Sequence, residues 1–312
     1  MGNIISIYES ASGLVQCTIR SQGCRYRLNG YGCIMCNYGA DKNITKEELS
    51  TALHKYVEPI LKDRVLFGTY GSILDESEIS VGVLNELMQF IKGSNAKTII
   101  LETHYKTITK RILEYISENI PNKEIIFEVG LESSDKSSII TIGKDICLED
   151  LRNTIHLVHE YNMEISANIL VGVPFKDTKA QVLDTLETVQ WAFNNKVDSV
   201  VLFPMNIKPN THIYDLYMNG EYTEISGWLL AEVLLNIDKE YLDKVHIAWY
   251  GNRKINNIRP ITCNKCKDIL MDFYKSYDKE RDINKRIELI QKLFKSNVDC
   301  DCKAQVINNV YN

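Results

Sequence analysis

Short apolar runs alternate with stretches of helical periodicity along most of the chain. A short apolar run bounded by polar residues predicts a buried strand, whereas apolar residues three and four positions apart predict one face of a helix. Strands are predicted at residues 14–20, 65–69, 98–101, 124–129, 165–173 and 199–203. Helices are predicted at residues 45–61, 84–91, 107–118, 148–158 and 182–193. Strands separated by helices imply right-handed crossovers, so we predict an α/β fold with a parallel sheet.

The last part of the chain departs from this alternation. One more strand is predicted at residues 245–249, and the apolar residues from Ile283 to Phe294 predict an amphipathic helix. A chain of 312 residues is long enough for one barrel-sized domain and an appendage. We therefore predict a first domain at residues 1–240 and a C-terminal extension at residues 241–312.

Three cysteines, Cys24, Cys33 and Cys36, lie in a glycine-rich stretch after the first predicted strand. Thiolates at this spacing, closed by a Cys-x-x-Cys, can bind either zinc or an iron–sulfur cluster. A closed site needs four ligands, whereas a cubane with three leaves one iron open for a small molecule. We expect Cys17 to be a small core residue, since free cysteines are often buried, and a four-cysteine site that includes it is the alternative.

This stretch resembles the cluster loop of radical S-adenosylmethionine (SAM) enzymes, in which three cysteines hold a [4Fe–4S] cluster whose open iron binds SAM. The spacing C-x8-C-x2-C departs from the commonest spacing of that family, C-x3-C-x2-C. It is closer to the branch that includes the radical SAM subunit of archaeosine synthase and the elongator catalytic subunit. The resemblance implies a partial (β/α)6 TIM-like barrel, with the active site at the carboxyl ends of its strands. It also implies that Met35 and Tyr38, in the same loop, contact the cofactor.

The turn after the second predicted strand contains Gly71 and Ser72. It is similar to the family segment whose backbone accepts the SAM amino group, where glycine lets the ligand approach closely. An ordinary strand-to-helix turn is the alternative interpretation. On the fifth strand Asn168, Val171 and Gly172 resemble the region that contacts SAM.

Two carboxylates follow neighbouring strands, Glu102 at the third and Glu132 just after the fourth. Both match the archaeosine and elongator branch. Either could hold ribose hydroxyls or a substrate amine, or could form only a salt bridge, because buried acids need partners in both cases. We take both as candidate catalytic residues, and Glu132 also as a candidate cofactor ligand.

A second cysteine group lies near the end of the chain, where Cys263 and Cys266 are followed much later by Cys300 and Cys302. Two close pairs of this kind can converge on one metal centre. The alternatives are a structural zinc and a second, fully ligated [4Fe–4S] cluster. Analogy with other radical SAM enzymes favours an auxiliary cluster.

Charge and cysteine use limit the function further. The net charge of −5 gives no general attraction for nucleic-acid phosphates. No apolar run is long enough for a membrane helix, and no apolar signal core is found at the start. Nine cysteines in such a chain indicate metal binding in a reducing compartment, so we expect a cytoplasmic protein without disulfides.

The sequence therefore predicts a radical SAM enzyme that cleaves SAM at a [4Fe–4S] cluster. The 5′-deoxyadenosyl radical would abstract hydrogen from a small-molecule or amino-acid-derived substrate, and a flavodoxin or ferredoxin would supply electrons. One alternative is an archaeosine synthase-like radical lyase that cleaves a carbon–nitrogen bond of a lysine-bearing deazaguanine in tRNA. The non-enzymatic alternative is a protein that binds zinc at both cysteine sites.

Overall fold

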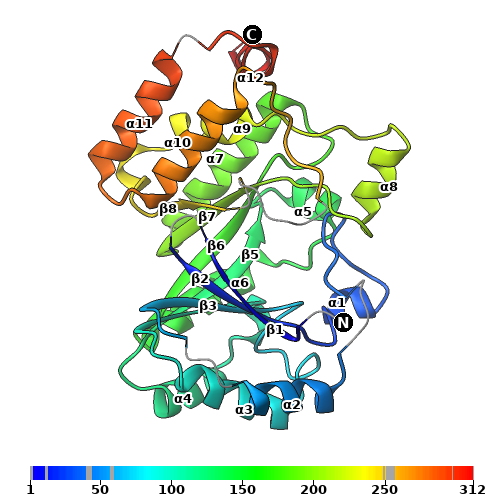
Figure 1. Ribbon diagram of the computed structural model, residues 1–312, viewed down its shortest axis with the longest axis vertical. Helices are drawn as coiled ribbons and strands as arrows, with labels where there is room; N and C mark the ends of the chain where they lie inside the picture. Colours follow the sequence, from blue (N-terminus) through cyan, green and yellow to red (C-terminus); the bar gives the residue numbers. More distant parts are fainter. Residues whose placement is uncertain are drawn as a thin grey trace. The chain divides into compact units, whose positions relative to one another are not determined.

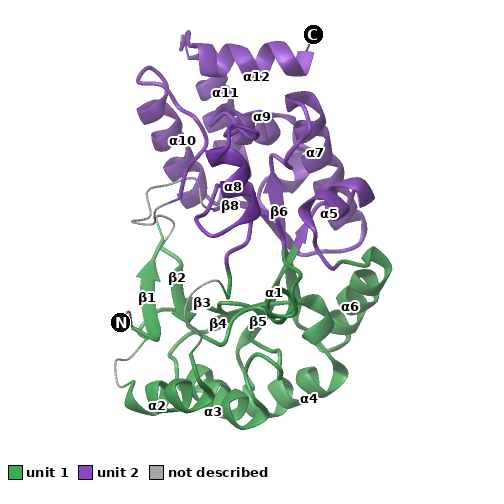
Figure 2. Cartoon of the chain, turned by 90° about the vertical axis from the view of Figure 1, so that its right-hand side faces the viewer, with its two compact units in different colours: residues 1–32, 38–130, 146–166 green, residues 33–37, 131–145, 167–312 purple. Residues whose placement is uncertain are grey.

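The computed structural model describes residues 3–10, 13–39, 44–56, 60–248, 250, 257–296 and 298–311. Two compact units divide the chain (Figure 2). Unit 1 contains residues 1–32, 38–130 and 146–166, and unit 2 contains residues 33–37, 131–145 and 167–312. The predicted domain boundary at residue 240 stays a prediction.

A single eight-stranded sheet has its strands in the order of the sequence, β1 to β8 (Figure 1). Its strands are β1 (Ile5–Glu9), β2 (Val15–Ile19), β3 (Arg64–Thr69), β4 (Thr98–Thr103), β5 (Glu124–Glu132), β6 (Glu164–Val171), β7 (Ser199–Pro204) and β8 (Val245–Ile247). Strand β1 is antiparallel to β2, whereas β2 to β5 pair in parallel and β7 pairs in parallel with β8. This curled α/β sheet confirms the predicted partial TIM-like barrel.

The helices of unit 1 follow its strands, and α2, α3 and α4 lie along one face of the sheet (Figures 1 and 2). They are α1 (Arg25–Leu28), α2 (Lys46–Lys55), α3 (Val81–Lys92), α4 (Lys110–Asn119) and α6 (Leu148–Glu160), with a short 3-10 helix η1 (Tyr105–Thr107). Val65 and Phe67 of β3 and Leu87 and Ile91 of α3 are fully buried. Each such side chain contributes about 1.5–3 kcal/mol on burial.

The helices of unit 2 pack on one another, and α9 contacts α7, α11 and α12. They are α5 (Lys136–Ile142), α7 (Thr178–Asn194), α8 (His212–Met218), α9 (Trp228–Asn236), α10 (Lys267–Lys279), α11 (Ile283–Lys295) and α12 (Asp301–Tyr311), with a 3-10 helix η2 (Lys239–Tyr241). The predicted amphipathic helix at residues 283–294 is α11.

Several predicted boundaries shift for local reasons. The predicted helix at residues 107–118 begins later, at Lys110, because the Thr109 hydroxyl accepts a hydrogen bond from the amide of Ile112 and caps it. Strand β6 ends at Val171, since Gly172 adopts a positive φ of 93°. The capping box of Thr45 and Glu48 opens α2 as predicted. The predicted end of that helix overlaps residues 57–59, and the predicted strand at 245–249 includes Trp249, all outside the described residues.

Candidate functional site

The cysteine loop begins four residues after β2 and its two ends touch at glycines. Gly23 has a φ of 103°, and a Cβ there would lie 2.5 Å from the Cα of Gly39. Only glycine allows this approach, so the pair closes the base of the loop. Cys17, within β2, is fully buried, and burial raises its pKa to about 12. It is therefore a core thiol, in contrast to Cys24, which is partly exposed.

Cys24 lies at the start of helix α1, where Glu78 holds the backbone. The amide of Arg25 donates to Glu78 Oε1 over 2.7 Å, and the amide of Ser72 donates to Glu78 Oε2 over 2.6 Å. Arg25 Nε also lies 3.3 Å from Asp75 Oδ2. Within unit 1, a single buried carboxylate thus joins the first cysteine's helix to the turn after β3. Glu78 was not predicted as a site residue, because it lies in an acidic turn without a recognisable motif.

The segment after β3 that is predicted to bind the SAM amine is held in place by contacts at Gly71 and on both sides of it. A Cβ on Gly71 would lie 2.0 Å from Glu78 Oε2, so a side chain there would displace the carboxylate. Ser72 is buried, and its hydroxyl lies 2.6 Å from that of Thr103. The ring of Tyr38 stacks on Tyr70 with centroids 5.7 Å apart. Glycine at position 71 therefore makes room for the Glu78 carboxylate, and the predicted contact of this turn with the SAM amine stays a prediction.

Glu102 belongs to the same unit, near the carboxyl end of β4. Its backbone carbonyl accepts a hydrogen bond from Ile73, and its side chain lies over Gly68, where a Cβ would meet Oε2 at 2.4 Å. The side chain is partly exposed. Its predicted catalytic role stays a prediction.

Cys33 and Cys36 belong to unit 2 and share a tight turn, in which the amide of Cys36 donates to the Cys33 carbonyl over 3.0 Å. Between them, the amide of Ile34 donates to the carbonyl of Ile142 over 2.8 Å, and its carbonyl accepts from Ile213. Met35 is buried. Backbone contacts therefore dock the Cys-x-x-Cys turn against the end of α5.

Glu132 ends β5 in a conformation that few non-glycine residues adopt, with a φ of 62°. It is buried, and its Oε1 accepts from Lys144 Nζ over 2.8 Å. Its Oε2 is buried without a hydrogen-bond partner in the described part of the chain. Burial by itself lowers the pKa of Lys144, but the charges of Glu132, Cys33 and Cys36 together raise it.

A polar network holds the turn that follows Glu132. Asp184 of α7 is buried and accepts hydrogen bonds from the hydroxyls of Ser133 and Ser138 and from Lys176. Lys176 also pairs with Asp135 over 3.1 Å, and hydrogen bonds, chiefly from Ser137, hold the pKa of Asp135 well below its usual range. These residues fix the β5–α5 turn, and sequence periodicity gave no indication of them.

The last predicted SAM-contact residues lie at the end of β6. The carbonyl of Val171 accepts a hydrogen bond from Met205 over 2.9 Å. Gly172 follows, and a Cβ there would lie 2.8 Å from the side chain of Ile225. Asn168 is partly exposed on the same strand.

The predicted residues thus divide between the two units. Unit 1 contains Cys24, Tyr38, Gly71, Ser72 and Glu102, and unit 2 contains Cys33, Met35, Cys36, Glu132, Asn168, Val171 and Gly172. Their assignment as one site stays a prediction.

The four C-terminal cysteines, in contrast, meet within unit 2. The sulfur atoms of Cys263, Cys266, Cys300 and Cys302 all lie within 4.8 Å of one another. Cys263 Sγ and Cys266 Sγ are 3.5 Å apart. The predicted convergence of the two cysteine pairs is therefore confirmed, and their donor set fits a soft metal ion.

The surrounding backbone fixes both cysteine pairs onto α9. The hydroxyl of Ser226 donates to the carbonyl of Cys302 over 3.1 Å, and the amide of Gly227 donates to the carbonyl of Ile261 over 2.8 Å. Lys303 Nζ lies 5.1 Å from the ring centroid of the buried Trp228. The cysteines thus join the start of α10, the start of α12 and the start of α9.

The thiols of this cluster differ in their affinity for protons. Burial raises the pKa of Cys266 to about 12. Burial also opposes ionisation of Cys263, but hydrogen bonds from Cys266, Lys265 and Cys300 lower its pKa to about 7. A bound cation would favour the thiolate form of Cys266 at neutral pH, because it offsets the cost of a buried negative charge.

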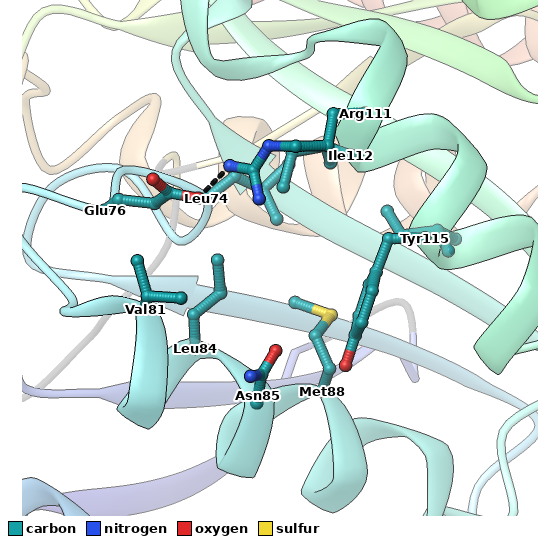
Figure 3. Close-up of a pocket in the computed structure, with 10 residues that line it drawn as sticks. Leu74, Glu76, Val81, Leu84, Asn85, Met88, Arg111, Ile112 and Tyr115 are labelled. Carbon is teal, nitrogen blue, oxygen red and sulfur yellow. Dashed lines mark hydrogen bonds and ion pairs between the residues drawn. The ribbon is translucent and has the colours of Figure 1, made fainter.

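A small pocket lies in unit 1 between helices α3 and α4 (Figure 3). Its volume of about 30 Å³ is room for about one water molecule, and Arg111 pairs with Glu76 at its edge. It is lined by helix residues such as Met88 and Tyr115, and none of the predicted site residues lines it.

No protein-family model matches the chain. The uncharacterized protein MJ0550 of Methanocaldococcus jannaschii is 27% identical over 302 residues, which cover 91% of this chain and 78% of MJ0550. Uncharacterized protein MJ0486 of the same organism is 19% identical over 211 residues, which cover 64% of this chain and 63% of MJ0486.

Among solved structures, the archaeal Elp3 of Methanocaldococcus infernus, with residues 1–46 deleted, matches with a TM-score of 0.52 and 12% identity. The match covers 87% of this chain and 65% of the Elp3 chain, so this chain spans less than two thirds of Elp3. The chain therefore has an Elp3-like fold, which is the fold expected from its resemblance to the elongator branch of radical SAM enzymes. No helix in the described part of the chain is long and apolar enough to cross a membrane.

Proposed function

We propose that this protein is a radical SAM enzyme. The observation that carries the proposal is the place of the C-x8-C-x2-C loop, which follows the first parallel strand, β2, of an Elp3-like partial barrel. Cys24, Cys33 and Cys36 would hold a [4Fe–4S] cluster. Their chemistry fits it, because all three are partly exposed thiols and thiolates are the usual ligands of such a cluster.

When bound, the cluster and SAM supply reductive cleavage of a carbon–sulfur bond and a 5′-deoxyadenosyl radical. The chain's own residues bind and orient the ligands. The turn of Gly71 and Ser72 would offer its backbone to the SAM amine, with Met35 and Tyr38 beside the cluster loop. Asn168, Val171 and Gly172 would contact SAM from the end of β6.

Glu102 and Glu132 would hold hydroxyl or amine donors of SAM or the substrate. For Glu132 the support is specific, since its buried Oε2 has no hydrogen-bond partner among the described residues. An acceptor left in this state indicates a ligand that donates to it. We propose a small-molecule or amino-acid-derived substrate, with an archaeosine synthase-like tRNA lyase as the alternative, and a flavodoxin- or ferredoxin-like electron donor.

We further propose that the four C-terminal cysteines hold one four-coordinate ion, with zinc as the first candidate. A tetrahedral ion with metal–sulfur bonds of about 2.3 Å places its sulfurs about 3.8 Å apart. The observed sulfur separations, all within 4.8 Å, support that arrangement. In a cubane each cysteine binds a different iron. Because the irons are themselves apart, the four cysteine sulfur atoms would lie further from one another than around a single ion.

The SAM-cleaving activity is tested with anaerobically reconstituted protein. The reconstituted protein should be brown, and it should release 5′-deoxyadenosine when it is given dithionite and SAM. Cys24→Ala, Cys33→Ala and Cys36→Ala should each abolish this release, whereas the matched variant Cys17→Ala, which removes a core thiol, should retain it. Zinc in place of iron at the N-terminal cysteines would contradict the proposal and would favour the non-enzymatic alternative. Loss of release in a folded Cys17→Ala protein would overturn the ligand assignment.

A further inference from the structure

The turn after α5 places one lysine beside the Cys-x-x-Cys pair. Helix α5 ends at Gly143, whose φ of 72° reverses the chain, and the amide of Lys144 then donates to the Ile139 carbonyl. One residue before Gly143, the carbonyl of Ile142 accepts the amide of Ile34 over 2.8 Å. The backbone therefore fixes Lys144 next to the turn of Cys33 and Cys36.

The Lys144 side chain is largely buried and makes an ion pair with Glu132 over 2.8 Å. The charges of Cys33 and Cys36 also act on its ammonium. This arrangement collects one cation and three potential anions inside unit 2. A buried ion pair gives little net stability compared with apolar side chains, so its presence at a strained residue indicates a role in the site.

We propose that Lys144 is a positioning residue of the cluster site, which offsets the negative charge of Cys33 and Cys36 and holds Glu132 with its Oε2 free for a ligand. The proposal rests on the proposed function. A fixed cation beside the ligands of a negatively charged centre stabilises the bound centre and favours its more negative, reduced state. Lys144 would thereby strengthen iron retention and raise the reduction potential.

The test compares Lys144→Met with Lys144→Arg, which keeps the charge, and with Lys136→Met, which removes an exposed lysine from the start of α5. The readouts are iron retention against a chelator and an electron paramagnetic resonance redox titration. The first cluster is identified as the signal that changes when SAM is added. Lys144→Met should lose iron about tenfold faster and should show a more negative midpoint potential. Lys144→Arg should keep most of the iron retention and most of the midpoint potential of the parent protein. Lys136→Met should match the parent protein in both.

A double variant, Glu132→Gln with Lys144→Met, separates this role from that of a simple structural ion pair. Removing both partners leaves no unpaired buried charge, so a purely structural defect should recover. If iron retention and potential stay impaired, the cation acts on the cysteines, as proposed. Recovery in the double variant, or unchanged values in Lys144→Met, would overturn the proposal.

Two further results complete the test. If Lys144→Met does not fold, Lys144→Gln provides the same comparison with a polar side chain. If the parent protein itself binds no iron at the first site, the proposed function fails, and this outcome differs from a failure confined to the Lys144 variants.

Discussion

Glu78 accepts two backbone amides from segments far apart in the sequence, one beside Cys24 and one in the turn after β3. Its side chain is almost completely buried, at 4% exposure. Burial raises the pKa of Glu78 from 4.5 to about 7, although the hydrogen bonds from the two amides lower it. A carboxyl that supports both predicted cofactor segments therefore changes its charge near neutral pH.

This raised pKa predicts a specific dependence of stability on pH. Because the folded state binds the Glu78 proton more tightly than the unfolded state, the stabilisation is complete below pH 4.5 and is lost as pH rises through about 7. The full difference corresponds to about 3 kcal/mol. Urea unfolding at pH 5 and pH 8 should therefore show the parent protein losing stability relative to Glu78→Gln, whose side chain does not titrate.

The matched control for this prediction is Glu76→Gln. Glu76 lies on the same acidic turn but pairs with the exposed Arg111 and does not contact the two amides. The difference in unfolding free energy between Glu76→Gln and the parent protein should change much less between pH 5 and pH 8. If the unfolding free energies of the parent protein and Glu78→Gln differ by the same amount at pH 5 and pH 8, the prediction is wrong, because the buried carboxyl then stays ionised.

The candidate site residues predicted from the sequence lie in recognisable local motifs, such as those of Gly71, Cys33 and Cys263. Glu78, Lys144 and Asp184 were missed, because each acts through a partner that only the tertiary fold brings close. An isolated acid or lysine carries no periodicity and no fixed spacing. Their partners could not be inferred from one sequence.

The same contrast holds for whole elements. The six central strands and their long helices were predictable because buried strands give continuous apolar runs and α3, α6 and α7 give clear helical stripes. Strand β1 was missed because four of its five residues are exposed at the edge of the sheet. Helices α1 and α5 were missed because short helices show too few turns for a periodic pattern.

At the C-terminus, the cysteine cluster attaches α12 to α9 and α10, and this gives a prediction about metal removal. The triple variant Cys24→Ala, Cys33→Ala and Cys36→Ala leaves only this cluster. It should contain about one zinc per chain, and Cys300→Ser with Cys302→Ser should then lower the melting temperature by at least about 5 °C, because the ion stabilises only the folded chain. Metal analysis and thermal unfolding provide the two measurements.

The control for that prediction is Cys147→Ser, which removes an exposed cysteine outside the cluster. Its melting temperature should stay close to that of the parent protein. Retention of about four irons by the triple variant after anaerobic reconstitution would instead identify an auxiliary cubane. In that case removal of Cys300 and Cys302 from the parent protein, which keeps Cys24, Cys33 and Cys36, should spare uncoupled SAM cleavage. It should abolish turnover of the true substrate.

The net charge of the chain bears on the proposed class of substrate. The net charge of −5 opposes accumulation of phosphate backbones around the chain. A small-molecule substrate needs no such attraction, since a few buried polar groups such as Glu132 can recognise it. The Elp3-like fold is compatible with either class, because fold alone does not determine substrate.

We therefore predict weak binding of bulk tRNA at physiological salt. Each phosphate that a protein neutralises contributes a slope of about −0.7 to −0.9 to the log–log dependence of affinity on salt, so binding driven by phosphates falls steeply. Fluorescence anisotropy with labelled tRNA from about 50 to 200 mM salt measures this slope, with single-stranded DNA of equal length as the control for non-specific attraction. Tight, steeply salt-dependent binding of tRNA in preference to DNA would contradict the prediction. It would indicate a local basic surface strong enough to overcome the net charge, and it would make the archaeosine synthase-like lyase the preferred function.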